Sequence, residues 1–208
     1  MRNVTDRTSN PFGMRPDCER FVPGYGDANA DFHVVGDSPR VHGGADTGVP
    51  FTNDAGRRLQ DALVRAGLLR EAGDEPGVDR TFLSYLDMCV RDRPTTEAEY
   101  ADMDRFFDAE VRAIAAHVLL PIGARATTHV FETFTARRVE PPLDMEALHA
   151  TEVLGSGWLV VPVREPAEWD DAHADRLVAG LDDLRSTDFR READLGRFLS
   201  GGESYHVR

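Results

Sequence analysis

Residues 36–51, GDSPRVHGGADTGVPF, decide how the rest of this chain is interpreted. The apolar run Phe32-His33-Val34-Val35 precedes this segment, and an amphipathic helix is expected to begin near Ala55. A buried strand therefore ends on a glycine and an acid, and a long loop rich in glycine, proline and aspartate leads to a helix. In an open α/β sheet, ligands bind outside the carboxyl ends of the strands. The segment is thus the first candidate for a binding site.

Apolar runs predict four strands, and amphipathic segments between them predict four helices. The strands are expected at residues 31–35, 81–86, 117–122 and 157–163, and the helices at 55–69, 94–116, 124–137 and 171–184. Asp54 is expected to cap the first helix, and Thr95 or Thr96 the second. Residues 70–80 are expected to form an exposed loop. The alternation predicts an α/β fold, a three-layer α/β/α sandwich with a mainly parallel four-stranded central sheet.

Polar residues follow three of the predicted strands directly. The loops begin at Asp37, Asp87 and Arg164. Because parallel strands end at one edge of a sheet, these three groups are expected to converge there, as a pocket requires.

The length of 208 residues is enough for one α/β domain with a sizeable core. We expect a single domain over residues 1–208, with an irregular N-terminal wrap at 1–30 and a C-terminal tail at 188–208. The N-terminus lacks the apolar stretch of a secretory signal, and no apolar run approaches the ~20 residues that span a bilayer. A cytoplasmic location is the default expectation.

The charge balance is strongly acidic, with 37 acidic and 24 basic residues and a net charge of −13. Every basic residue is arginine, because the chain contains no lysine. This composition favours adaptation to a salt-rich cytoplasm, where negative charge maintains solubility. The alternative is an acidic protein from a GC-rich genome. Acidity weakens a nucleic-acid hypothesis only modestly, since phosphate attraction is small for any protein in concentrated salt.

Two cysteines, Cys18 and Cys89, are present. In a cytosolic chain a structural disulfide between them is not expected. Two thiols cannot complete a four-thiolate iron–sulfur or zinc site, and the histidines lack metal-ligand spacing. No metal site is therefore expected.

The segment at 36–51 resembles the first motif of the uracil-DNA glycosylase superfamily. The family pattern is a strand, a glycine with an acid, a proline, further acidic residues, then Gly-x-Pro-Phe and a helix. Here it reads Gly36-Asp37-Ser38-Pro39, then Gly48-Val49-Pro50-Phe51, then Ala55-Gly56. The similarity covers roughly residues 10–187. It is closest to the thermostable iron–sulfur, family 4-like branch, in a form common in salt-loving archaea.

The resemblance implies a role for each residue of this motif. Asp37 would be the catalytic acid that stabilises the sugar cation and orients water. Phe51 would stack on the flipped base, while Gly36, Ser38 and Pro39 would contact the base edge. Apart from the resemblance, Arg40 and His42 are candidates for contact with DNA phosphates around this loop, and the alternative is that these side chains are only solvated. The alternative is that Asp37 caps a turn and Phe51 is a core residue.

The later motifs differ from the family pattern. The family's last motif carries a histidine that stabilises charge on the base; here Glu165 occupies that position as a second catalytic residue. The neighbouring Arg164 would supply a fixed cation as a substrate-binding residue, because a glutamate cannot act as an imidazolium. Tyr85 occupies the place of an asparagine that reads the uracil edge, and it makes one hydrogen bond rather than a paired contact.

The iron–sulfur branch uses four cysteines, of which Cys89 matches the third. Met103 occupies the place of the fourth, and only Cys18 remains near the N-terminus. The sequence therefore predicts that the ancestral 4Fe–4S site is lost and that no cofactor is bound.

These features favour a DNA glycosylase of base-excision repair that hydrolyses the N-glycosidic bond of uracil or another damaged base. Its partner would be DNA containing that base, or the free base, and it would act as a monomer. Two alternatives remain open. One is a catalytically altered descendant that binds DNA or a base, and the other is a nucleoside or nucleotide hydrolase.

Overall fold

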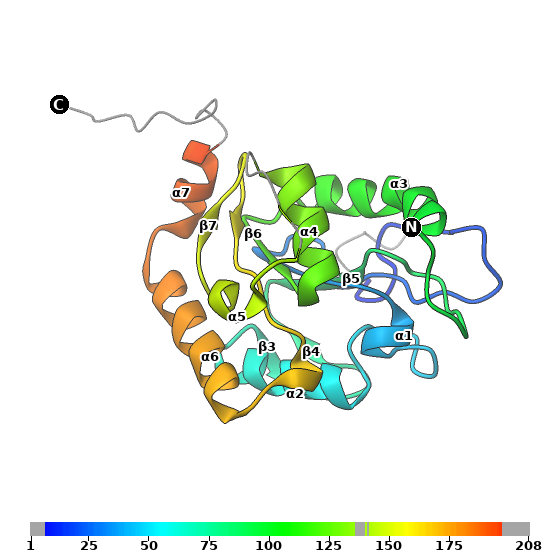
Figure 1. Cartoon of the computed structure of the whole chain (residues 1–208), viewed down its shortest axis with the longest axis horizontal. Coiled ribbons are helices and arrows are strands. Elements are labelled where there is room, and N and C mark those ends of the chain that lie inside the picture. The colour runs from blue at the N-terminus through cyan, green and yellow to red at the C-terminus, as the bar shows by residue number, and fades with distance from the viewer. Residues whose placement is uncertain (1–6, 136–139, 141, 197–208) are drawn as a thin grey trace.

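The computed structural model describes residues 7–135, 140 and 142–196. Within these residues the central sheet has six strands in the order β1-β5-β2-β6-β8-β7 (Figure 1). Four of them run parallel: β2 (Phe32–Gly36), β5 (Thr81–Tyr85), β6 (Val118–Pro121) and β8 (Leu159–Val160). Strand β1 (Tyr25–Gly26) pairs antiparallel with β5, and β7 (Val153–Leu154) pairs antiparallel with β8.

The prediction of a mainly parallel sheet is confirmed, but the number of strands is six rather than four. Both additional strands lie at the edges of the sheet and are two residues long. Such short strands carry no alternation of apolar and polar residues, so a search for periodicity does not detect them.

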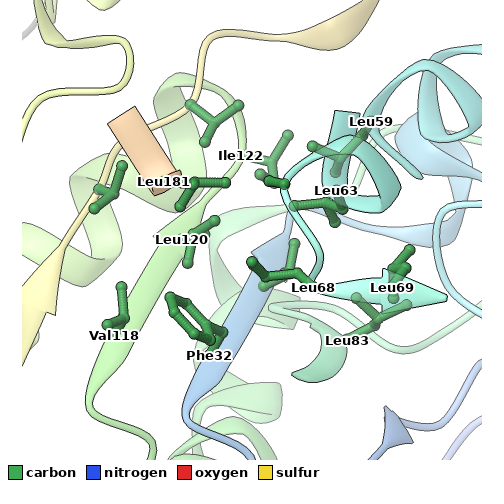
Figure 2. Packing of buried hydrophobic residues seen from close by; sticks show 14 of the residues in the cluster. Phe32, Leu59, Leu63, Leu68, Leu69, Leu83, Val118, Leu120, Ile122 and Leu181 are labelled. Carbon is green, nitrogen blue, oxygen red and sulfur yellow. The ribbon is translucent and has the colours of Figure 1, made fainter. Parts of the chain in front are cut away.

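Helices cover both faces of the sheet, as the predicted three-layer sandwich requires (Figure 1). On one face, α2 (Asp54–Arg65), α6 (Asp171–Ser186) and α7 (Phe189–Gly196) pack on a core that includes Val34 and Leu120. On the other, α3 (Glu97–Ile114) and α4 (Gly123–Phe134) pack on Val35 and Leu119. Adjacent strand residues thus serve opposite faces, because side chains alternate along a strand. Figure 2 shows the first of these clusters.

Shorter elements lie in the connections between these strands and helices. They are α1 (Pro39–His42), α5 (Met145–Leu148) and the 3₁₀ turn η2 (Pro166–Glu168). Asn53, rather than the predicted Asp54, caps α2, since its side chain accepts a hydrogen bond from the Gly56 N–H at 2.8 Å. Thr96 caps α3 in a capping box with Glu99, as one of the two predicted alternatives.

The first predicted helix is too long at its carboxyl end. Helix α2 ends at Arg65, and Gly67 has a φ of +69°, which breaks the helix at little steric cost. The chain then forms a hairpin of β3 (Leu69–Glu71) and β4 (Gly77–Val78), where a loop was expected. The sequence did not predict these strands, because the charged residues of the hairpin interrupt any apolar pattern.

The predicted tail begins with a helix that packs on the sheet. The Phe189 side chain is buried against Phe32, with ring centroids 5.3 Å apart. Arg190 donates hydrogen bonds to the buried carboxylate of Asp31, which Arg80 also contacts. Burial opposes ionisation of Asp31, but these two guanidinium groups hold its pKa well below the usual range. Residues 197–208 of the predicted tail lie outside the described residues.

Two further ionisable groups are buried in the apolar layers. Burial lowers the pKa of His33 to about 3. Burial also raises the pKa of Glu110 to about 8, and the nearby Gly24 backbone opposes that shift. Both side chains are therefore uncharged in the folded protein near pH 7.

The two cysteines form a disulfide, which corrects the expectation of two separate thiols. Cys18 and Cys89 are bonded across 71 residues, with their Cα atoms 6.1 Å apart. The bond ties the N-terminal wrap to the loop after β5, where Phe21 and Cys89 also form a β-bridge. Among the described residues, no helix is both long enough and apolar enough to cross a membrane.

Candidate active site at the carboxyl edge of the sheet

The parallel strands deliver the candidate residues to one edge of the sheet. Asp37 follows β2, Asp87 follows β5, and the backbone N–H of Asp87 donates to the carbonyl of Asp37 at 3.0 Å. On the other side of β2, Gly123 follows β6, and a Cβ built on it would lie 3.0 Å from the Glu165 Oε2. The loops after four strands therefore meet at this edge.

Asp37 is half-buried, and its carboxylate is held by a tyrosine from another layer. The Tyr100 hydroxyl, on α3, donates a hydrogen bond to Asp37 Oδ1. The guanidinium of Arg125 lies 4.4 Å from the centre of the Tyr100 ring, and Arg125 forms a two-pronged ion pair with Glu97. Burial, together with the adjacent Asp37, raises the pKa of Tyr100, so its hydroxyl stays a donor.

His42 lies between the backbone of Asp37 and the side chain of Glu165. The Asp37 N–H donates to His42 Nδ1 at 3.3 Å, which assigns the ring proton to Nε2. Nε2 lies 3.0 Å from Glu165 Oε2 and donates to it. The other oxygen, Glu165 Oε1, is buried and has no hydrogen-bond partner among the described residues. The second predicted acid is therefore linked to the first through a single imidazole ring.

The aromatic rings of His42, Phe51 and Tyr85 pack together in this site. The His42 ring is 5.3 Å from Phe51 and 6.2 Å from Tyr85, to which it is nearly parallel at 20°. The Tyr85 hydroxyl accepts from the Phe51 N–H at 2.6 Å and donates to the Gly43 carbonyl at 3.0 Å. All three side chains are buried. Phe51, which was predicted to stack on a base, thus packs against His42 and Tyr85 in this structure.

The remaining residues of the first motif form the turn that brings the His42 ring next to the backbone of Asp37. A Cβ on Gly36 would lie 2.8 Å from both the Phe51 and the Tyr85 rings, so only glycine fits there. Ser38 and Pro39 are buried at the start of α1, and the Ser38 carbonyl accepts from the His42 N–H at 3.0 Å. Arg40 is exposed on the same short helix. Its contact with DNA stays a prediction, whereas His42 lies inside the site.

Arg164 is engaged away from this cluster. Its guanidinium contacts Glu146 and also Glu168, the latter at 3.2 Å. Its backbone N–H donates to His149 Nδ1 at 3.0 Å. The next side chain, Glu165, bonds instead to His42. In this arrangement the positive charge of Arg164 is balanced by carboxylates other than Glu165.

Sequence reasoning missed Tyr100 and Arg125 altogether and assigned His42 to DNA contact. Tyr100 lies 63 residues from Asp37, and His42 lies 123 residues from Glu165. Neither pair leaves a local signal, because the contacts depend on which strands and helices become neighbours.

The donor set near Cys89 does not suit a four-thiolate cluster. Cys89 is bonded to Cys18, and its sulfur lies 4.0 Å from the Met103 thioether. Among the described residues, no group of three or more His, Cys, Asp or Glu side chains is arranged to hold a metal ion. The absence of an iron–sulfur cluster stays a prediction.

Comparison with known proteins supplies the family. The profile of the "Uracil DNA glycosylase superfamily" matches residues 23–178, three quarters of the chain. The chain is also 35% identical over 140 residues to a type-5 uracil-DNA glycosylase of Thermus thermophilus, covering 58% of this chain and 62% of that protein.

Two further relatives bear the same name. The type-5 enzyme of Pyrobaculum aerophilum is 31% identical over 125 residues, 56% of this chain and 55% of that protein. That of Mycobacterium leprae is 31% identical over 114 residues, 51% of this chain and 50% of that protein. The matches thus span about half to three fifths of the length of these relatives. Because the family profile covers most of the fold and its first motif forms the site above, this chain belongs to the uracil DNA glycosylase superfamily.

Proposed function

We propose that this protein is a DNA glycosylase of base-excision repair, which hydrolyses the N-glycosidic bond of uracil or another damaged base in DNA. One observation carries the proposal most directly. The acid of the family's first motif, Asp37, lies at the carboxyl edge of the sheet with its carboxylate held by the Tyr100 hydroxyl. Three relatives named as type-5 uracil-DNA glycosylases support the same reaction class.

The reaction divides into bond cleavage and addition of water. The target nucleotide first leaves the helix stack. The bond between the base and C1′ of the sugar then breaks, its electron pair leaves with the base, and the sugar becomes an oxocarbenium-like cation. The Asp37 carboxylate stabilises that cation and orients a water molecule, whose oxygen bonds to C1′ as its proton passes to the carboxylate. The hydrogen bond from Tyr100 keeps the carboxylate oriented.

The side chains next to the proposed position of the base, those of Arg164 and His42, offer little positive charge to a departing base. Arg164 is paired with Glu146 and Glu168. The ring proton of His42 is donated to Glu165. A base that leaves as an anion is therefore weakly stabilised, and we expect slow turnover on uracil.

The experiment is base release from oligonucleotides that contain a single uracil or hypoxanthine, measured in molar KCl. We expect release by the native chain and none by Asp37→Ala. Asp46→Ala is the matched control, since Asp46 is an exposed acid of the same loop. No release from either lesion, or equal release by Asp37→Ala, would refute the proposal.

A second candidate, a descendant that binds DNA or a base without turnover, is favoured by the closed aromatic cluster. Phe51, Tyr85 and His42 have no exposed surface in this conformation. Tight binding of uracil-containing DNA together with no release over many hours would select this candidate.

Several properties accompany the proposal and await their own tests. We expect a monomeric, cytoplasmic protein adapted to high salt, with one domain over residues 1–208, no iron–sulfur cluster, and an origin near the iron–sulfur branch of the family. Activity that rises as the KCl concentration increases from about 0.1 M to several molar would support the salt adaptation. Over this range the surface charges become almost fully screened. Iron and sulfide analysis of anaerobically purified protein tests for the cluster.

A further inference from the structure

Three sulfur atoms from distant parts of the chain lie close together. Cys18 comes from the N-terminal wrap, Cys89 from the loop after β5, and Met103 from α3. Cys18 and Cys89 are bonded to each other, and the Cys89 sulfur lies 4.0 Å from the Met103 sulfur. The Cys89 and Met103 side chains are buried, whereas Cys18 is half-buried. Two cysteines and a thioether therefore meet at one place, which solvent reaches from the side of Cys18.

Backbone hydrogen bonds hold the two cysteine-bearing segments together independently of the disulfide. The Val22 N–H donates to the Met88 carbonyl at 2.8 Å. The Val90 N–H donates to the Arg20 carbonyl at 2.9 Å. These bonds flank Cys89 on both sides, so reduction of the disulfide frees two thiols without separating the segments that carry them.

The donor set is soft and has three members. Thiolate and thioether ligands select Cu⁺, zinc or iron–sulfur clusters. A cluster takes four ligands, chiefly thiolates, whereas the chain has two cysteines. Structural zinc takes four thiolate, imidazole or carboxylate ligands, and among the described residues no three His, Cys, Asp or Glu side chains are arranged to hold a metal ion. Of the three, Cu⁺ is the one that two thiolates and a thioether satisfy.

The spacing of the sulfur atoms fits a single three-coordinate ion. A metal–thiolate bond is about 2.3 Å long, so three sulfurs placed around one ion at angles of about 120° lie about 4 Å from one another. The Cys89 and Met103 sulfurs already lie 4.0 Å apart. Once the disulfide is reduced, the Cys18 sulfur is free to move away from Cys89 to the third position.

We propose that the reduced form of this chain holds one Cu⁺ ion between Cys18, Cys89 and Met103. A dithiol reductant supplies two electrons and two protons to the disulfide and is itself oxidised to a disulfide, which leaves two thiols on the chain. Cu⁺ then binds both sulfurs as thiolates, their two protons pass to solvent, and the oxidation state of the ion does not change. The ion replaces the disulfide as the link between the N-terminal wrap and the loop after β5. The sequence-based expectation of no metal site counted thiols and histidines but not this thioether.

The test is an anaerobic competition for Cu⁺ between the native chain and bicinchoninate, a chelator whose Cu⁺ complex is coloured. The chain is first reduced with dithiothreitol, which is then removed, and potassium acetate replaces KCl because chloride itself binds Cu⁺. We expect the reduced chain to take one Cu⁺ per chain from the chelator and the disulfide-bonded chain to take none. Binding should also protect both cysteines from alkylation, as measured by mass spectrometry.

The variant Met103→Leu tests the thioether, because leucine keeps the volume of the side chain and preserves the packing. Even the outer-shell partners of a metal site contribute about 10–100-fold in affinity, so loss of a direct ligand should weaken Cu⁺ binding at least about tenfold. Met145→Leu is the matched control, since Met145 is a half-buried methionine of α5, and it should leave the affinity unchanged. Cys18→Ser leaves one thiol and should abolish the transfer of Cu⁺ from the chelator.

A second measurement follows the link that the ion makes. A ligand that binds the folded chain raises its stability, so Cu⁺ should raise the melting temperature of the reduced native chain more than that of Met103→Leu. Equal Cu⁺ binding by the reduced and the disulfide-bonded chain would overturn the proposal, and so would native affinity in Met103→Leu. These measurements do not involve DNA, so their outcome is separate from that of the proposed glycosylase reaction.

Discussion

Replacement of Tyr100 by phenylalanine removes one hydroxyl from the site and leaves the ring beneath Arg125 in place. That hydroxyl donates to Asp37 Oδ1. A hydrogen bond to a charged group contributes about 1.5–3 kcal/mol, and each 1.4 kcal/mol is about tenfold in rate. Because Tyr100 and Asp37 are only half-buried, water replaces part of the lost bond, and the lower end of the range applies. We expect about a tenfold fall in the rate of base release.

The assay is single-turnover base release at saturating protein, which reports the chemical step without product release. Binding of lesion DNA should change less than twofold or so, since Tyr100 acts through Asp37 rather than on the base. Tyr25→Phe is the matched control, because it removes a tyrosine hydroxyl that bonds to the Pro76 carbonyl at 3.1 Å. It should leave the rate unchanged.

The reasoning fails if Tyr100→Phe retains the native rate while Asp37→Ala is inactive, since the carboxylate would then need no support. It also fails if Tyr25→Phe slows the reaction equally, because the effect would then reflect stability alone.

Three further predictions concern stability. Glu110 has a pKa of about 8 in the folded protein and an ordinary value near 4.5, so the folded state binds more protons and stability falls as pH rises between these values. His33 acts in the opposite direction, because burial lowers its pKa from the ordinary 6.5 and the unfolded chain loses this proton around that pH. Between about pH 7 and 8, where most of the His33 titration is complete, Glu110→Gln should flatten the fall of melting temperature. Asp31→Asn leaves two arginines without their buried partner and should cost about 3 kcal/mol in urea unfolding, more at low salt than at high salt. Reduction of the Cys18–Cys89 disulfide should cost up to about 4 kcal/mol, measured as the difference in urea unfolding with and without reductant. An unchanged pH profile, a neutral Asp31→Asn variant or identical unfolding curves would contradict the respective prediction.

The local pattern of the sequence was sufficient for the main elements. The apolar run at Phe32–Val35 predicted β2 because a strand buried on both faces needs apolar residues throughout. A cap at Thr95 or Thr96 was predicted because capping is decided within a few residues, and the structure selects Thr96. The hairpin β3–β4 and the edge strands β1 and β7 were missed, since these short strands form only where a neighbouring strand offers hydrogen bonds.

In the candidate site too, some residues could be placed from the sequence and others only from the structure. By itself, the sequence determined the family motif from Gly36 to Phe51 and thereby the position of Asp37 at the end of a strand, because a motif and its strand are contiguous in the chain. Only the tertiary structure decided that Tyr100 bonds to Asp37 and that His42 bonds to Glu165. These contacts arise from the order of parallel strands and the handedness of their crossovers, which bring distant loops to one edge of the sheet.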